Sequence, residues 1–173
     1  MPRHYHSPMV TVPSRAPHPL RPKDETDMTA PSERARNKSR KRVNDHMSRY
    51  LKTGGEDGHI WSGAPTLLLT TTGRESGEPY TTPLIYGQDG ERYLLVASRT
   101  GAPRHPGWYR NLRKTPDVEL QILADRFPAQ ARTATPEERP ALWSIMTKIW
   151  PPYEEYQTRT DREIPVVVLE LRA

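Results

Sequence analysis

The chain has 173 residues, of which 26 are Lys or Arg, 21 are Asp or Glu and only 34% are hydrophobic. This length suits one domain of ordinary size with a tail, rather than two domains. The lack of cysteine excludes disulfides, thiolate metal sites and a cysteine nucleophile. No apolar run resembles a signal peptide or approaches the roughly 20 residues that cross a bilayer, so we expect a cytoplasmic protein.

Positive charge and proline are concentrated at the N-terminal end. Residues 1–50 hold 11 Lys or Arg against 5 Asp or Glu, so the remainder is close to neutral, and 7 of the 19 prolines lie within residues 1–31. Since residues 1–30 show no apolar periodicity, we predict a disordered Pro/Arg-rich tail there. Four of the six histidines, at positions 4, 6, 18 and 46, are counted with the tail, where we expect only weak adventitious metal binding and no metal site.

Residues 31–52 predict a basic amphipathic helix. Val43, Met47, Tyr50 and Leu51 recur at the spacing that gathers side chains on one helical face. In one interpretation this apolar stripe packs on the domain and the cationic face meets water. In the other, the helix makes peripheral contact with an anionic membrane.

Residues 53–173 carry dense strand signals. Segments 64–72 and 80–86 predict a hairpin around the turn at 73–79, and the Asp89-Gly90 pair is typical of a tight turn into a third strand at 92–98. We expect these three strands to form a meander.

The rest of the chain alternates short helices and strands. Thr135, Pro136 and Glu138 give the pattern of a capped helix start, and Pro151 ends that helix. Short connections favour antiparallel pairing, so we expect a mainly β, α+β fold: a small antiparallel barrel with covering helices. The expected elements are a helix at 108–114, strands at 118–122 and 127–133 around a turn at 124–126, a helix at 137–150 and a strand at 165–171.

The turn after the first long strand is a candidate anion site. Segment 70–77 offers threonine hydroxyls, backbone N–H groups and the guanidinium of Arg74, which together suit phosphate, although it lacks the lysine of a P-loop. An ordinary hairpin turn with a surface arginine remains the alternative. Arg99 ends another strand, and Trp108 and Asn111 share one side of a helix, where they could meet a flat ligand.

Several separated motifs within residues 65–171 resemble the deazaflavin-dependent nitroreductase family. They are LLLTTTGRESGEPYTTPLIY, VASRTGAPRHPGWYRNL, PDVELQI, TPEER and PPYEEYQTRTDREIPVVVLE. The resemblance implies a split antiparallel β-barrel of the flavin-reductase and pyridoxine-oxidase type. It also implies the cofactor F420, a deazaflavin whose side chain carries a phosphate and an oligoglutamate tail.

The resemblance further implies roles for individual residues. Tyr153 and Tyr156 would form the substrate wall and are the candidate proton donors, although an aromatic core role remains open. The residues implied to bind the cofactor are Arg74, Ser76 and Gly77 at the phosphate, Tyr80, Thr81, Thr82, Pro83, Leu84, Ile85, Val96, Ala97, Ser98 and Arg99 along the deazaflavin groove, and Trp108, Tyr109 and Asn111 on the tail side.

Four positions depart from the family pattern. Glu75 stands where a basic residue is common, and Arg99 stands where Lys is usual and keeps its charge. Ile85 and Trp150 stand where some members carry Tyr. Both of these last positions concern the substrate, so nitroimidazole reduction is not expected.

The leading functional hypothesis is an F420-dependent oxidoreductase that passes a hydride to an electron-poor small molecule, such as a quinone, a nitroaromatic compound or an activated C=C bond. One alternative is an FMN-dependent reductase on the same barrel. Another is a non-catalytic cofactor-binding module whose basic tail engages a membrane or nucleic acid. Nucleic acid is not an expected partner, because residues 34–42 lack interleaved aromatics. Both a monomer and a homodimer remain open.

Overall fold

The structure, a computed structural model, describes residues 33–173, and the predicted disordered tail at residues 1–30 lies outside that range. The elements, in chain order, are α1 (Glu33–Thr53), β1 (Ile60–Trp61), β2 (Ala64–Thr72), β3 (Pro79–Ile85), β4 (Gly87–Asp89), β5 (Arg92–Val96), the 3-10 turn η1 (Arg99–Gly101), α2 (Gly107–Lys114), β6 (Asp117–Ile122), β7 (Asp125–Thr133), α3 (Arg139–Ile149), α4 (Pro152–Thr158) and β8 (Val166–Leu171).

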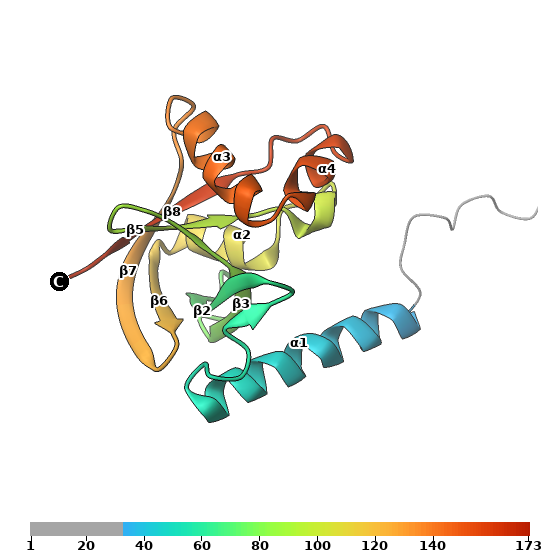
Figure 1. Cartoon of the computed structure of the whole chain (residues 1–173), viewed down its shortest axis with the longest axis vertical. Helices are drawn as coiled ribbons and strands as arrows, with labels where there is room; N and C mark the ends of the chain where they lie inside the picture. Colours follow the sequence, from blue (N-terminus) through green and yellow to red (C-terminus); the bar gives the residue numbers. More distant parts are fainter. Residues whose placement is uncertain (1–32) are drawn as a thin grey trace, which may run out of the picture.

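One curled antiparallel sheet forms the body of the described chain (Figure 1). Within residues 33–173 it has eight strands in the order β1-β2-β6-β7-β8-β5-β4, and β3 pairs with β2. Helices cover parts of this sheet, as Figure 1 shows for α3 and α4. The predicted fold class, mainly β with covering helices, is confirmed.

The hairpin of β2 and β3 is confirmed, but the predicted meander is wrong. Strand β5 pairs with β8 and β4, and not with β3. The tight turn at Asp89-Gly90 is real, with Gly90 at φ 62°, yet it joins β5 to the short β4. The β6–β7 turn also differs: it is centred on Leu123 and Ala124, because Ile122 pairs with Asp125.

Two apolar clusters lie on opposite faces of β5 and β8. Leu95 and Val167 face the first cluster, together with α2, whereas Leu94 and Val166 face the second, together with α3 and α4. Both faces of β8 are covered along residues 166–169, and these residues form a continuous apolar run rather than an alternating one. The same packing holds α2 and α4 against the sheet on the two sides of β5.

Helix α1 attaches to the sheet by only part of the predicted face, through Tyr50, and also by His46, which was not predicted. Val43 and Leu51 are 43% and 45% exposed, whereas His46 and Tyr50 are buried. Tyr50 donates a hydrogen bond from its hydroxyl to the Thr66 carbonyl (3.1 Å) and accepts one from the Leu123 N–H (2.8 Å). Polar anchoring at Tyr50 therefore replaces most of the expected apolar stripe, and membrane contact through the outer face stays a prediction.

The capping interaction predicted before the helix that follows β7 is confirmed. The Glu138 N–H donates to Thr135 Oγ1 (3.3 Å), and the Thr135 N–H donates to the Glu138 carboxylate (3.0 Å). This is the reciprocal bonding of a capping box. Among the helices of the described chain, none is long and apolar enough to span a membrane.

Candidate active site

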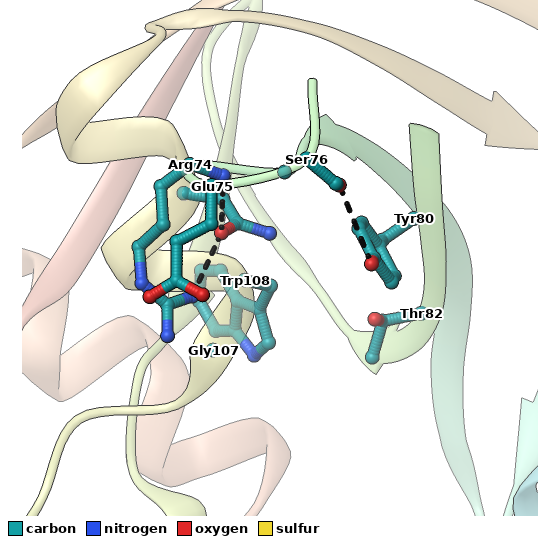
Figure 2. Close-up of a pocket in the computed structure, with 9 residues that line it drawn as sticks. Arg74, Glu75, Ser76, Tyr80, Thr82, Gly107 and Trp108 are labelled. Atoms are coloured by element: carbon teal, nitrogen blue, oxygen red, sulfur yellow. Dashed lines mark hydrogen bonds between the residues drawn. The ribbon is translucent and has the colours of Figure 1, made fainter. Parts of the chain in front are cut away.

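A cavity of about 490 Å³ lies between the β2–β3 turn and the N-terminal end of α2. Figure 2 shows Arg74 and Trp108 on one side of this cavity and Ser76, Tyr80 and Thr82 on the other. We call it the turn cavity. Its lining residues are Gly73, Arg74, Glu75, Ser76, Tyr80, Thr82, Gly107, Trp108 and Asn111.

Glycine makes the turn beside this cavity compact. The Gly77 N–H donates to the Gly73 carbonyl (2.9 Å), and Gly77 has a φ of 72°, which favours glycine. A β-carbon at Gly73 would lie 2.6 Å from both Ser76 Oγ and the Tyr80 ring. Ser76 and Tyr80 can therefore close over the turn only because residue 73 has no side chain.

Arg74 is held by a neutral partner. Asn111 Oδ1 accepts hydrogen bonds from the Arg74 N–H (3.2 Å) and from its guanidinium (2.9 Å), while Asn111 Nδ2 donates to Thr71 Oγ1 (3.2 Å). Lys114 Nζ also donates to the Arg74 carbonyl (2.6 Å). Within residues 33–173 no carboxylate forms an ion pair with Arg74, so its positive charge is available to an anionic ligand.

A larger cavity of about 700 Å³ adjoins the first, since Thr82 and Trp108 line both. We call it the aromatic cavity, because Trp and Tyr side chains from distant segments surround it. Its lining residues are Ser39, Arg42, Val43, His46, Trp61, Ser62, Thr66, Thr82, Pro83, Leu84, Ile85, Val96, Ser98, Arg99, Thr100, Pro106, Trp108, Trp150, Tyr153 and Tyr156.

The two tyrosines of α4 form one wall of the aromatic cavity. Their ring centroids are 6.1 Å apart with an interplanar angle of 74°. Burial, and to a lesser degree the neighbouring Tyr156, raises the pKa of Tyr153 well above its usual value. Tyr153 therefore keeps its proton throughout the physiological range and can donate a hydrogen bond.

Most of the predicted site residues gather at these two cavities. Arg74, Ser76, Tyr80, Thr82, Trp108 and Asn111 line the turn cavity, and Thr82, Pro83, Leu84, Ile85, Val96, Ser98, Arg99, Trp108, Tyr153 and Tyr156 line the aromatic cavity. Arg74, implied at the phosphate, and Arg99, implied along the deazaflavin groove, thus line different cavities.

Four predicted residues line neither cavity. Ala97 and Tyr109 are buried in the core, where the Tyr109 hydroxyl bonds Thr133 Oγ1 (2.8 Å). The Thr81 hydroxyl bonds Thr70 Oγ1 across the β2–β3 pair (2.8 Å). Gly77 shapes the turn through its backbone. These residues support the site rather than border it.

The N-terminal wall of the aromatic cavity was missed from the sequence. His46, counted with the tail, is in fact buried in α1, where its ring stacks on Trp61 at 4.5 Å and Nε2 donates to the Gly58 carbonyl (2.6 Å). Trp61 lies in the two-residue strand β1, which is too short to give a strand pattern. The position of His46 four residues before Tyr50, on one helical face, was the available signal.

Thr66 provides an independent indication that the aromatic cavity takes a polar ligand. Its side chain is 2% exposed, it lines the cavity, and its Oγ1 lacks a hydrogen-bond partner among the described residues. A buried hydroxyl without a partner is costly. A flat ring with polar edges, next to an anionic tail at Arg74, fits the donors that the two cavities present.

The comparisons with known proteins identify the family of this chain. An F420H(2)-dependent quinone reductase of Mycobacterium tuberculosis (strain ATCC 25618 / H37Rv) is 46% identical over 131 residues, which cover 73% of this chain and 88% of that protein. The solved structure of an F420-H2 dependent reductase (FDR-A) is 42% identical, with a TM-score of 0.58, over 61% of this chain and 94% of that one.

A second solved structure, described as a domain-swapped dimer, is 38% identical with a TM-score of 0.60 and covers 76% of this chain and 99% of that one. The family model described as F420H(2)-dependent quinone reductase matches residues 40–171. The chain therefore belongs to the F420H(2)-dependent quinone reductase family.

Proposed function

We propose that this protein binds reduced F420 across both cavities and reduces a quinone in the aromatic cavity. The observation that carries the proposal is that the two cavities adjoin, with Thr82 and Trp108 lining both. One cavity presents an arginine without a carboxylate partner, and the other presents aromatic walls. Family membership and this pairing of charge with aromatic surface support the same ligand, a flat ring that carries an anionic tail.

The turn cavity would hold the phosphate of the cofactor. Arg74 supplies the guanidinium and Ser76 the hydroxyl, while Asn111 fixes the arginine before ligand arrives. Hydrogen bonds to charged groups contribute about 1.5 to 3 kcal/mol each. Because Asn111 has already ordered Arg74, little side-chain entropy is lost when the anion binds.

The aromatic cavity would hold the ring and the acceptor together. Bound reduced F420 supplies the hydride, from C5 of its ring. The strand segment 82–85 and Val96 border one side, and Trp150, Tyr153 and Tyr156 border the C-terminal side. These walls would orient a planar quinone and restrict the access of water.

Reduction of a quinone to a hydroquinone needs one proton besides the hydride. Tyr153 keeps its proton because its pKa is raised by burial, so it suits hydrogen bonding to the quinone oxygen. Tyr156 is less buried than Tyr153, so it is better placed to pass a proton from solvent to the quinone. We assign the two residues these separate roles.

The test is a titration of the purified protein with F420 and with FMN, followed by oxidation of reduced F420 with quinones, nitroaromatics and activated alkenes. We expect saturable binding of F420, much weaker binding of FMN, and fastest turnover with quinones. Tight FMN binding without F420 binding would contradict the cofactor assignment. Turnover of nitroaromatics but not quinones would contradict the acceptor assignment.

A further inference from the structure

The turn that follows β5 has a backbone that favours glycine at two residues that are not glycine. Arg99 and Thr100 have φ values of 46° and 54°, and Gly101 follows at 82°. A left-handed conformation is unfavourable for a residue with a side chain. Other contacts must therefore hold the backbone of this turn. Arg99, at its start, lines the aromatic cavity.

Arg162, in the segment between α4 and β8, supplies these contacts. Its Nε donates to the Ala102 carbonyl (2.8 Å) and its Nη2 to the Ser98 carbonyl (2.7 Å). Its Nη1 contacts the Ala97 carbonyl (3.2 Å) and His105 Nδ1 (3.1 Å). All three guanidinium nitrogens thus form hydrogen bonds, and together they join the two flanks of one turn. A planar guanidinium can span both flanks, whereas the ammonium group of a lysine cannot.

The same turn is packed against α4. A β-carbon at Gly101 would lie 2.5 Å from the Tyr156 carbonyl oxygen, and Arg159 donates to the Thr100 carbonyl (3.3 Å). The backbone that carries Tyr156 and the backbone that carries Arg99 therefore meet directly. A change in the turn would move a charged group and an aromatic wall of the same cavity.

We propose that Arg162 is a positioning residue, which holds residues 98–102 in the conformation that presents Arg99 to the cofactor. The proposal rests on the proposed function, since it needs Arg99 to contact F420. Arg162 itself lines neither cavity among the described residues, so it acts through the turn. Neither composition nor spacing distinguishes it from the other arginines of the chain.

The first test compares wild type with Arg162→Met without any cofactor. Hydrogen–deuterium exchange should become faster in a peptide that covers residues 98–105, while peptides from β2 and β8 keep their wild-type exchange. Unchanged exchange at residues 98–105 would overturn the proposal whether or not the protein binds F420. This readout does not depend on activity.

The second test is a double-mutant cycle measured by F420 fluorescence. Arg162→Met should weaken F420 binding about tenfold, in line with the loss of one charge-assisted contact at Arg99. In the Arg99→Ala background, the same substitution should have little further effect, because the group that it positions is already gone. Full additivity of the two losses would overturn the proposal.

Two further variants separate positioning from charge and from stability. Arg162→Lys keeps the positive charge but not the planar guanidinium, so we expect its F420 affinity to lie well below that of wild type. Wild-type F420 affinity in Arg162→Lys would overturn the proposal. If Arg162→Met fails to fold, Arg162→Lys replaces it in the exchange and binding experiments. Arg132 is the matched control, because it pairs with Glu138 (2.7 Å) and lines neither cavity. Arg132→Met should lower the melting temperature and leave F420 affinity unchanged.

Failure of the proposed function looks different from failure of this inference. If wild-type protein does not bind F420, the proposed function fails, and the exchange experiment still decides whether Arg162 holds the turn. If wild type binds F420 and Arg162→Met binds it equally well, the proposed function stands and the inference fails.

Discussion

Arg74 is the residue on which the anion site depends most directly. Its hydrogen-bond partner Asn111 is neutral, so Arg74 supplies the positive charge of a cavity that Glu75 also lines. We expect Arg74→Ala to weaken F420 binding roughly ten- to a hundredfold, which corresponds to about 1.5 to 3 kcal/mol. The difference from wild type should shrink as salt rises, because screening weakens exposed attraction in the wild type. Fluorescence titration at several salt concentrations measures both effects.

A matched variant separates this local role from the net charge of the protein. Arg126 is an exposed arginine on β7 that pairs with Glu119 and lines neither cavity. Arg126→Ala removes the same charge and should leave F420 affinity nearly unchanged. Equal affinities for the Arg74 and Arg126 variants would show that the phosphate does not bind at the β2–β3 turn.

Thr66 should display a conflict between stability and binding. Thr66→Val replaces a buried hydroxyl that has no partner with a methyl group of similar size, so unfolding should become harder by about 1 kcal/mol. If the hydroxyl bonds the ligand, the same variant should bind F420 or the quinone more weakly. Denaturant unfolding and ligand titration on one preparation measure both. A destabilised Thr66→Val would mean that the hydroxyl has a partner in the free protein.

At the residue scale, sequence motifs identified side chains but not their directions. Arg74, Trp108 and Asn111 were predicted because a turn and a helix face gave them definite positions. Tyr109 was predicted with them, yet it points into the core, since adjacent helical residues lie about 100° apart. Arg162 was not predicted, because its role depends on carbonyl groups about 60 residues away.

At the element scale, the segment from β5 to α2 has a pH-sensitive contact. Burial, followed by the charges of Arg162, Arg113 and Arg110, lowers the pKa of His105 below its usual 6.5. The neutral ring accepts a hydrogen bond from Arg162 at Nδ1, so protonation would oppose this contact. Because the unfolded chain takes up this proton at higher pH, the stabilisation is complete above about pH 6.5 and is lost as pH falls below it.

We therefore expect the melting temperature of wild type to fall between pH 7 and pH 5, and to fall less in His105→Gln, whose side-chain oxygen can still accept from Arg162. The capping box of α3, formed by Thr135 and Glu138, does not contribute to this change in melting temperature. Hydrogen bonds from Arg132 and the Thr135 N–H lower the pKa of Glu138 below 4.5, so its contribution is lost only in more acidic solution. Parallel pH profiles for the two proteins would contradict the role of His105.

Elements were predicted well where local chemistry decides them. The bounds of β2 match the predicted strand, and the capping box before α3 forms as expected. The pairing of β5 was not predicted, because strand partners depend on which apolar faces become covered in the whole fold. Helix α1 was predicted as a helix, and Tyr50 was placed on its inner face, but the buried His46 was missed because a histidine adds nothing to an apolar pattern.

At the scale of the whole molecule, the aromatic cavity is assembled from segments far apart in sequence. Helix α1 and β1 form one wall, β3 and the turn after β5 form another, and the region from Trp150 through α4 forms a third. Figure 1 shows α1 extending along one side of the body, with its C-terminal end next to the sheet. The cavity can therefore lose one wall while the sheet and the anion site stay in place.

Helix α1 forms one wall of the aromatic cavity, whereas residues 1–32 lie outside the family match. The family match begins at residue 40, so deletion of residues 1–32 should leave the melting temperature and F420 affinity near wild type. Deletion through Thr53 should lower the melting temperature, since it removes Tyr50 and leaves the Thr66 carbonyl and Leu123 N–H without that partner. It should also raise the KM for quinone more than the Kd for F420, because Arg74 and Asn111 remain.

Trp61→Ala separates the wall from the anchor. It keeps Tyr50 and its hydrogen bonds but removes the ring on which His46 stacks, so it opens the cavity with a smaller effect on stability. We expect a raised KM for quinone and nearly unchanged F420 affinity, from steady-state kinetics and fluorescence titration. If Trp61→Ala weakens F420 and leaves quinone KM unchanged, the ring of the cofactor lies against α1, and the acceptor belongs at the Tyr153 side alone.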